Sequence, residues 1–258
     1  MPVADQLADL RYQIALANRM LAQQGVLDAF GHVSARHPSN PERYLLSRSL
    51  APEMVEPDDI LEYTLDSDPV QRTDARLYVE RVIHGEIYKA RRDITCVVHH
   101  HAASFMPLVV TGIDYVPVFH LGMYAGTHPP FWDQREEFGD TNLLVVKPEE
   151  GASLAKRLGK HWMVLMRRHG VTAVGTTIPE TVFRCVYSCR SAEFQMRAMS
   201  LGTIAPFTPG EMKLGTAANP GEMRAWNLWR THLEKTGGLP AAPRKPAKSP
   251  RRAAPKRK

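Results

Sequence analysis

Residues 95–101 read Thr-Cys-Val-Val-His-His-His. The β-branched and apolar residues at the start of this stretch predict a short buried strand. Side chains two positions apart lie on the same face of a strand, so His99 and His101 project together while His100 points the other way. Two such imidazoles can bind one divalent metal ion, and a pair of this kind also occurs as ordinary polar surface. The stretch therefore predicts a strand with two candidate metal ligands at its end.

A third ligand has to come from another part of the chain. Residues 163–166 and 171–174 read as two strands joined by the sequence Arg-Arg-His-Gly, which puts His169 at the bend of a predicted hairpin. His169 is the best placed candidate for this ligand. Three neutral imidazoles with an open fourth position form the ligand set of a catalytic metal site.

Strands and helices alternate along the rest of the chain. Residue periodicity and turn residues predict further strands at 31–38, 44–46, 60–65 and 143–146. Helices are expected at 5–27, 77–90, 151–158, 181–201 and 222–233, and residues 52–59 are expected to form a loop or a short helix. This mixture predicts an α/β or α+β layered domain.

The predicted helix at 77–90 carries a possible proton-transfer group. Glu80 and His84 are four residues apart and would share one helix face. An acid close to a metal ion can move protons for a bound substrate. The alternative is a solvated Glu–His pair with no chemical role.

The net charge of the chain is concentrated at its C-terminal end. The chain has 33 Lys and Arg against 27 Asp and Glu, a net charge of +6. Residues 240–258 contain eight Lys and Arg and no acid, so residues 1–239 hold 25 basic and 27 acidic residues, a net charge of −2. The sequence therefore predicts one folded domain over 1–239 and a disordered basic tail over 240–258, and leaves any nucleic-acid contact to nonspecific binding by the tail.

The composition also indicates a compartment. The chain lacks an apolar run of about 18 residues, so we expect no membrane span. Its N-terminus lacks the basic and apolar regions of a secretory signal. The three cysteines do not form a disulfide framework, and Cys185 and Cys189 are expected to be packing thiols on one helix. A cytoplasmic protein is the expectation.

Taken in order, four motifs resemble the class II aldolase/adducin family. They are Gly-His-Val-Ser-Ala-Arg at 31–36, Glu80, Val-Val-His-His-His at 97–101, and Leu-Met-Arg-Arg-His-Gly at 165–170, within a resemblance spanning about residues 5–210. The resemblance implies an α/β fold with α/β/α layers around a mainly antiparallel sheet, and a homotetramer with active sites at subunit interfaces. It also implies that His99, His101 and His169 bind the metal and that Glu80 is the catalytic acid/base.

Departures from the sugar-phosphate aldolases narrow the expected substrate. The family's phosphate-binding Asn is replaced here by His32, and a Ser-Ser pair before the catalytic Glu is replaced by Tyr78 and Val79. These changes argue against a phosphorylated substrate, and the motifs resemble the branch of hydroxymethylpyridine-dicarboxylate and dihydroxyphthalate decarboxylases. The candidate substrate-binding residues are Arg48, which could clamp a carboxylate, together with Ser47, Ser49, His32, Tyr124 and His120.

The expected function is therefore a divalent-metal-dependent decarboxylase, a carboxy-lyase of aromatic compound catabolism. Its substrate would be a hydroxylated aromatic or heteroaromatic carboxylic acid whose phenolic oxygen and ortho carboxylate chelate one ion per subunit, which could be Mn, Zn, Fe or Co. The alternatives are an aldolase or epimerase acting on a non-phosphorylated hydroxy-acid, a three-His Fe(II) oxygenase, and a non-catalytic adducin-like interaction protein.

Overall fold

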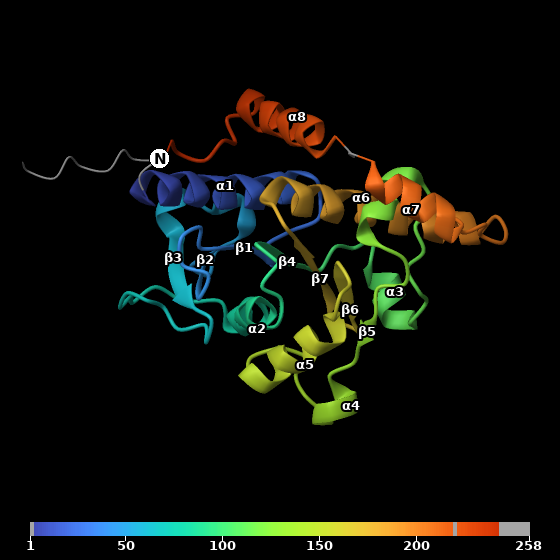
Figure 1. Ribbon diagram of the computed structural model, residues 1–258, viewed down its shortest axis with the longest axis horizontal. Helices are drawn as coiled ribbons and strands as arrows, with labels where there is room; N and C mark the ends of the chain where they lie inside the picture. Colours follow the sequence, from blue (N-terminus) through green and yellow to red (C-terminus); the bar gives the residue numbers. More distant parts are fainter. Residues whose placement is uncertain (1–2, 219–220, 243–258) are drawn as a thin grey trace, which may run out of the picture.

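A seven-stranded sheet forms the centre of the molecule (Figure 1). The computed structural model describes residues 3–218 and 221–242, so most of the predicted basic tail lies outside the described residues. The strands are ordered β3-β2-β1-β4-β7-β6-β5 across the sheet. Their bounds are β1 His32–Arg36, β2 Arg43–Ser47, β3 Ile60–Thr64, β4 Cys96–His100, β5 Phe131–Trp132, β6 Met163–Met166 and β7 Gly170–Gly175.

Strand β4 is the central strand and pairs antiparallel with both of its neighbours. His99 lies opposite His32 of β1 on one side and opposite Thr172 of β7 on the other. The remaining pairs are antiparallel except for β5 with β6, which is parallel. The expectation of a mainly antiparallel sheet is confirmed.

Helices cover both faces of the sheet and give three layers (Figure 1). Helices α1 (Val3–Gln23) and α6 (Ile178–Met199) lie on one face, with α8 (Glu222–Lys235) packed outside them. Helices α2 (Val82–Ala90) and α5 (Pro148–Leu158) lie together on the other face. The shorter elements are α3 Met106–Thr111, α4 Arg135–Phe138, α7 Pro209–Ala217, and the 3-10 helices η1 Pro52–Met54, η2 Pro57–Asp59, η3 Val79–Arg81 and η4 His120–Ala125.

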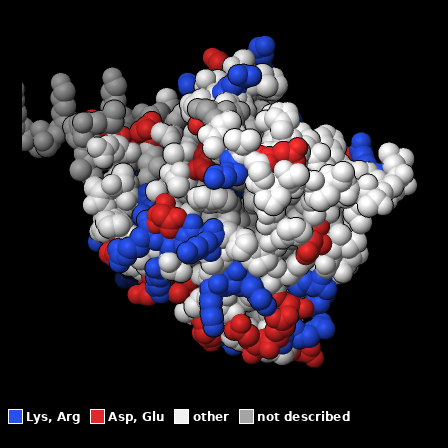
Figure 2. Space-filling view, turned by 45° about the vertical axis from the view of Figure 1, so that its right-hand side comes forward, with Lys and Arg blue, Asp and Glu red and all other residues white. Residues whose placement is uncertain are grey.

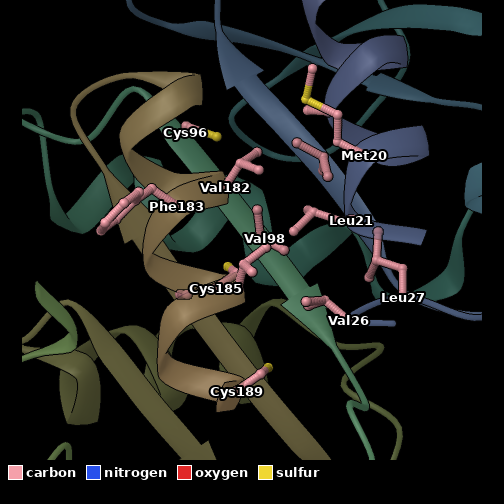
Figure 3. Packing of buried hydrophobic residues seen from close by; sticks show 14 of the residues in the cluster. Met20, Leu21, Val26, Leu27, Cys96, Val98, Val182, Phe183, Cys185 and Cys189 are labelled. Atoms are coloured by element: carbon pink, nitrogen blue, oxygen red, sulfur yellow. The ribbon is translucent and has the colours of Figure 1, made fainter. Parts of the chain in front are cut away.

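Each face of the sheet has its own apolar core, because alternate side chains of a strand point to opposite faces. Cys96 and Val98 of β4 pack in the core beneath α1 and α6, which Figure 3 shows from close by. Val97 packs in the second core, beneath α2 and α5. Cys185 and Cys189 of α6 are buried free thiols in the first core, which confirms their expected packing role.

Two predicted elements differ from the structure. The helix expected at 77–90 begins only at Val82, because Glu80 sits in the 3-10 turn η3 with φ −88° and ψ 15°, outside the helical region. The predicted strand at 143–146 is wrong. Leu143 has a φ of 67°, and the carboxylates of Glu80 and Glu150 accept the N–H groups of Val145 and Val146 that a strand would offer to a neighbour.

Helix α7 was not predicted. It begins at a capping box in which Thr208 and Glu211 satisfy each other's backbone N–H groups, a signal present in the sequence.

None of the helices in residues 3–218 and 221–242 combines the length and apolar character needed to cross a membrane. On the face shown in Figure 2, Lys and Arg side chains lie among Asp and Glu side chains over its lower half. This mixture of charges agrees with the nearly neutral composition of residues 1–239.

Arg36, at the end of β1, is a structural residue. Its guanidinium donates to the carbonyl oxygens of Tyr88 (2.7 Å) and Arg91 (3.0 Å) at the end of α2, and to those of Ile94 (2.9 Å) and Pro41 (2.5 Å). The last carbonyl groups of a helix have no hydrogen-bond donor inside the helix. An arginine that donates to them therefore fixes the helix end. Arg36 therefore ties α2 to the sheet.

We predict that Arg36→Ala lowers the free energy of unfolding by about 3 kcal/mol, because buried carbonyls lose their donors. Arg36→Lys should recover little of this loss, since one ammonium cannot reproduce the planar fork of donors. Urea unfolding followed by circular dichroism measures both. The matched control is Arg43→Ala, which removes a half-exposed ion pair with Glu62 and should cost less than about 1 kcal/mol. Equal losses in Arg36→Ala and Arg43→Ala would contradict the assigned role.

Candidate metal centre

Four predicted site residues meet at the end of β4. The Nε2 atoms of His99 and His101 lie 3.0 Å apart, and His169 lies in the turn between β6 and β7. Glu80 of η3 lies against them, with Oε1 3.4 Å from His169 Nε2 and Oε2 3.7 Å from His99 Nε2. One potential ligand atom from each of the four lies within 4.8 Å of the others. The structure thus brings together the three predicted ligands and the predicted acid/base.

The ring orientations follow from the strand geometry. The rings of His101 and His169 stack, with centroids 5.2 Å apart and planes at 12°, while the His99 ring stands nearly perpendicular to both. Gly170 makes this approach possible: a Cβ there would lie 2.4 Å from the His100 carbonyl oxygen and 2.8 Å from His101 Cδ2. On the other side of β4, Gly31 has a φ of +93°, and a Cβ would lie 2.8 Å from the His99 carbonyl oxygen. Only glycine fits at either position without displacing the ligand strand.

A hydrogen-bond chain behind His99 favours one tautomer. Thr172 of β7 donates its hydroxyl proton to Met166 Sδ at 3.4 Å and lies 3.1 Å from His99 Nδ1. With its proton directed to Met166 Sδ, Thr172 Oγ1 can accept an N–H from His99 Nδ1. In that tautomer the lone pair of His99 lies on Nε2, toward the cluster, as a metal ligand requires.

Burial controls the charge of the cluster. Burial and, to a smaller extent, the neighbouring His101 lower the pKa of His169 to about 4, opposed by a hydrogen bond to the backbone of Leu143. Burial likewise lowers the pKa of His99 well below its usual value. The same desolvation raises the pKa of Glu80 to about 7, opposed by the hydrogen bond from Val145 N–H. The three imidazoles are thus neutral ligands near pH 7, beside an acid that is close to its midpoint.

This donor set fits a divalent ion. Three neutral imidazoles with a nearby carboxylate are a common set for Zn, Mn, Fe and Co, and the favoured tautomer of His99 presents its free nitrogen. His100, by contrast, is buried on the opposite face of the sheet, and its ring lies 6.0 Å from Phe105. The prediction that His100 points away from the other two histidines is confirmed.

Two members of the cluster, Glu80 and His101, line a cleft of about 370 Å³. Among the predicted substrate-binding residues, His32 and Ser49 line this cleft with Glu80 and His101. Ser47 is buried at the end of β2, next to Tyr78. Apolar side chains form most of the remaining wall: Ala29, Phe30, Leu50, Ala51, Leu77, Val79 and Leu144.

Besides Ser47, three predicted substrate-binding residues are absent from the cleft lining in the single chain. Arg48 pairs with Asp59 at 2.7 Å and lines a separate hollow that also contains Glu56 and Asp58. His120 and Tyr124 line another hollow, of about 460 Å³. The Tyr124 hydroxyl lies 2.9 Å from the carbonyl oxygen of Gly215 and 2.8 Å from that of Ala218. The substrate-binding roles of these residues remain predictions.

Sequence reasoning missed two features of the site. Arg76 lines the cleft four residues before Glu80, in a stretch for which the sequence offered no prediction. His84 does not share a face with Glu80, because the helix starts after Glu80. Instead, His84 is buried against His32 and Ser34 of β1, each at 2.6 Å.

Comparisons with known proteins agree with this geometry. The chain is 34% identical over 245 residues to the decarboxylase tropJ of Talaromyces stipitatus, covering 85% of this chain and 92% of that protein. It is 25% identical to the 3,4-dihydroxyphthalate decarboxylase of Arthrobacter keyseri, covering 88% of this chain and 94% of that protein. Among solved structures, L-fuculose 1-phosphate aldolase from Glaciozyma antarctica superposes with a TM-score of 0.76 at 18% identity, with 95% of each chain covered. That likeness concerns the fold.

The family match covers the elements that build the site. The Class II Aldolase and Adducin N-terminal domain matches residues 12–196, from α1 to near the end of α6. This range includes all three histidines and Glu80. The chain belongs to the class II aldolase and adducin family.

Proposed function

We propose that the protein is a metal-dependent carboxy-lyase that removes CO2 from a hydroxylated aromatic or heteroaromatic carboxylic acid. The observation that carries the proposal is a buried acid, Glu80, which lies in contact with three neutral imidazoles and lines a largely apolar cleft. The family and the relatives named as decarboxylases support a lyase.

His99, His101 and His169 would hold one divalent ion per subunit through their Nε2 atoms. When bound, such an ion supplies Lewis-acid stabilisation of the negative charge that develops on the substrate as CO2 leaves. The donor set accommodates Mn, Zn, Fe or Co.

Glu80 is suited to the proton transfer. When the bond between the ring carbon and the carboxylate breaks, its electron pair stays on the ring carbon and a proton must replace CO2. A carboxyl group with a pKa of about 7 is populated in both forms at neutral pH, so it can give this proton and take another from solvent. The hydrogen bond from Val145 N–H to Oε1 at 3.0 Å holds the group in place.

The cleft favours a flat ring over a phosphorylated sugar. Val79 and Phe30 supply an apolar rim, and Tyr78 donates its hydroxyl to the Leu50 carbonyl oxygen at 2.5 Å. Arg76 lines the cleft and is suited to an anionic group such as a carboxylate, whereas Arg48 is paired with Asp59 outside it. The apolar rim supports an aromatic substrate.

A homotetramer with clefts at subunit interfaces, in a cytoplasmic catabolic enzyme, is part of the same proposal. Phe30 and Val79 are 68% and 53% exposed at the cleft rim, more than apolar side chains usually are in an isolated subunit. A neighbouring subunit that covers this rim could bring its own His120 or Tyr124 toward the cleft.

The metal prediction concerns stoichiometry. We expect about one divalent ion per chain in the purified protein, and loss of most of it in His99→Ala and in His169→Ala, because each variant leaves two imidazoles. Elemental analysis by mass spectrometry measures the ion. His161→Ala, which changes an exposed histidine outside the cluster, should keep the wild-type content. Equal metal in all four proteins, or none in the wild type, would contradict the proposed site.

The catalytic prediction concerns CO2. The metal-loaded protein should release CO2 from ortho-hydroxy aromatic or pyridine carboxylates, and Glu80→Gln should reduce kcat about 100-fold or more through loss of the proton donor. The amide keeps an oxygen for Val145 N–H, so the fold should be unchanged. Glu53→Gln, at an exposed position outside the cleft, is the control. Full turnover in Glu80→Gln would refute its role, and aldehyde release or O2 consumption in place of CO2 release would favour the aldolase or oxygenase alternative.

A further inference from the structure

A chain of four buried polar groups runs from the cleft into the layer beneath α2. His32 Nδ1 lies 2.6 Å from His84 Nε2, and His84 Nδ1 lies 2.6 Å from Ser34 Oγ. Ser34 Oγ in turn lies 2.8 Å from the Tyr88 hydroxyl. Ser34, His84 and Tyr88 are fully buried, and His32 is 3% exposed. The metal-site chemistry described above does not use this chain.

The chain is rigidly held. His32 and Ser34 are on β1, and His84 and Tyr88 are one turn apart on α2, so the packing of helix on sheet sets every distance. The Tyr44 ring stacks parallel to His84, with 6.3 Å between centroids and 15° between planes. Burial lowers the pKa of His84 to about 3, so this ring stays neutral and carries one N–H.

Along this chain of hydrogen bonds, only one direction of donation gives every polar hydrogen an acceptor. Within the described residues, Ser34 is the hydrogen-bond partner of the Tyr88 hydroxyl. If Tyr88 donates to Ser34, then Ser34 donates to His84 Nδ1, and His84 Nε2–H donates to His32 Nδ1. The reverse direction leaves one buried hydroxyl hydrogen of Ser34 or Tyr88 without an acceptor, which folded proteins avoid. His32 Nδ1 is therefore an acceptor, and the single proton of a neutral His32 lies on Nε2.

His32 Nε2 belongs to the cleft side of this ring. His32 lines the cleft, and no hydrogen bond within residues 3–218 and 221–242 occupies its Nε2. The ring lies between Tyr78, with centroids 4.6 Å apart, and the ligand His99, with centroids 5.3 Å apart. A donor fixed beside the metal ligands is placed to meet an oxygen of whatever binds there.

We propose that the Tyr88–Ser34–His84 chain holds His32 as its Nε2–H tautomer, and that this N–H donates to a carboxylate oxygen of the acid bound in the cleft. His32 is then a specificity residue that selects a hydrogen-bond acceptor next to the metal. The identity of the acid rests on the proposed function, whereas the tautomer does not.

The tautomer is read directly by long-range ¹H–¹⁵N correlation NMR on the full-length, zinc-loaded protein labelled with ¹⁵N-histidine. The His32 signals are assigned by their absence in His32→Gln. We expect an unprotonated Nδ1 and a protonated Nε2 for His32, and a mixture of the two tautomers in Ser34→Ala, which removes the donor that sets the direction. A protonated Nδ1 in the wild type, or an unchanged pattern in Ser34→Ala, would overturn the proposal.

Ligand binding tests the proposed contact between His32 and a carboxylate oxygen. For the zinc-loaded protein and 2-hydroxybenzoate in calorimetry, we expect His32→Phe to weaken affinity about 10- to 100-fold, the loss of one hydrogen bond to a charged group. His32→Gln keeps an N–H donor near Nε2 and should recover part of the affinity. Catechol, which chelates without a carboxylate, should bind wild type and His32→Phe alike.

The outcomes separate this inference from the proposed function. Wild-type affinity in His32→Phe, an equal loss for catechol, or no binding of 2-hydroxybenzoate to the wild type would refute the carboxylate contact. Zinc content, measured in every variant, verifies that the metal site is intact. Absence of CO2 release from any acid tested would refute the decarboxylase proposal, while the NMR and binding results would still decide the role of His32.

Discussion

The pairing of β4 with β1 on one side and β7 on the other is the constraint on which the site depends. It holds His99 opposite His32 and Thr172, so one strand position places a candidate ligand between its hydrogen-bond partner Thr172 and His32, which lines the cleft. The β6–β7 turn then delivers His169 to the same end of the sheet. Glycine at 31 and 170 lets both neighbours approach β4 so closely. The register of the sheet therefore determines where the candidate ligands lie relative to one another.

Glu80 links the second layer to this geometry. It lies ahead of α2 in a turn that is free of helical constraints, which allows its carboxylate to reach the histidines instead of running along the helix face. The same carboxylate accepts Val145 N–H and so helps to keep residues 143–146 out of the sheet. Taking the acid out of water is what raises its pKa to about 7. The position that lets Glu80 hold residues 143–146 also gives it the raised pKa on which its proposed proton transfer rests.

Much of the site could be predicted because its signals are local. His99 and His101 are two residues apart on a strand, which places them on one face. His169 lies at the bend between two clear strands. The three candidate ligands could therefore be proposed from the sequence. Glu80 was a candidate from its place on the predicted helix, and the resemblance gave it the acid/base role, but its backbone conformation was not predicted, since the run 77–90 has helical periodicity throughout. The strand predicted at 143–146 failed because the carboxylates of Glu80 and Glu150 accept the N–H groups of Val145 and Val146. The positions of Arg76, Arg48 and Tyr124 depend on the paths of loops, which no local pattern encodes.

The central claim is that three histidine side chains form one metal site. X-ray absorption at the zinc edge of the full-length, zinc-loaded protein tests it most directly, because outer-shell scattering from imidazole rings counts the histidine ligands. The account predicts three imidazoles around the ion in the wild type and two in His169→Ala. A spectrum with no imidazole scattering, or one that His169→Ala leaves unchanged, would contradict it.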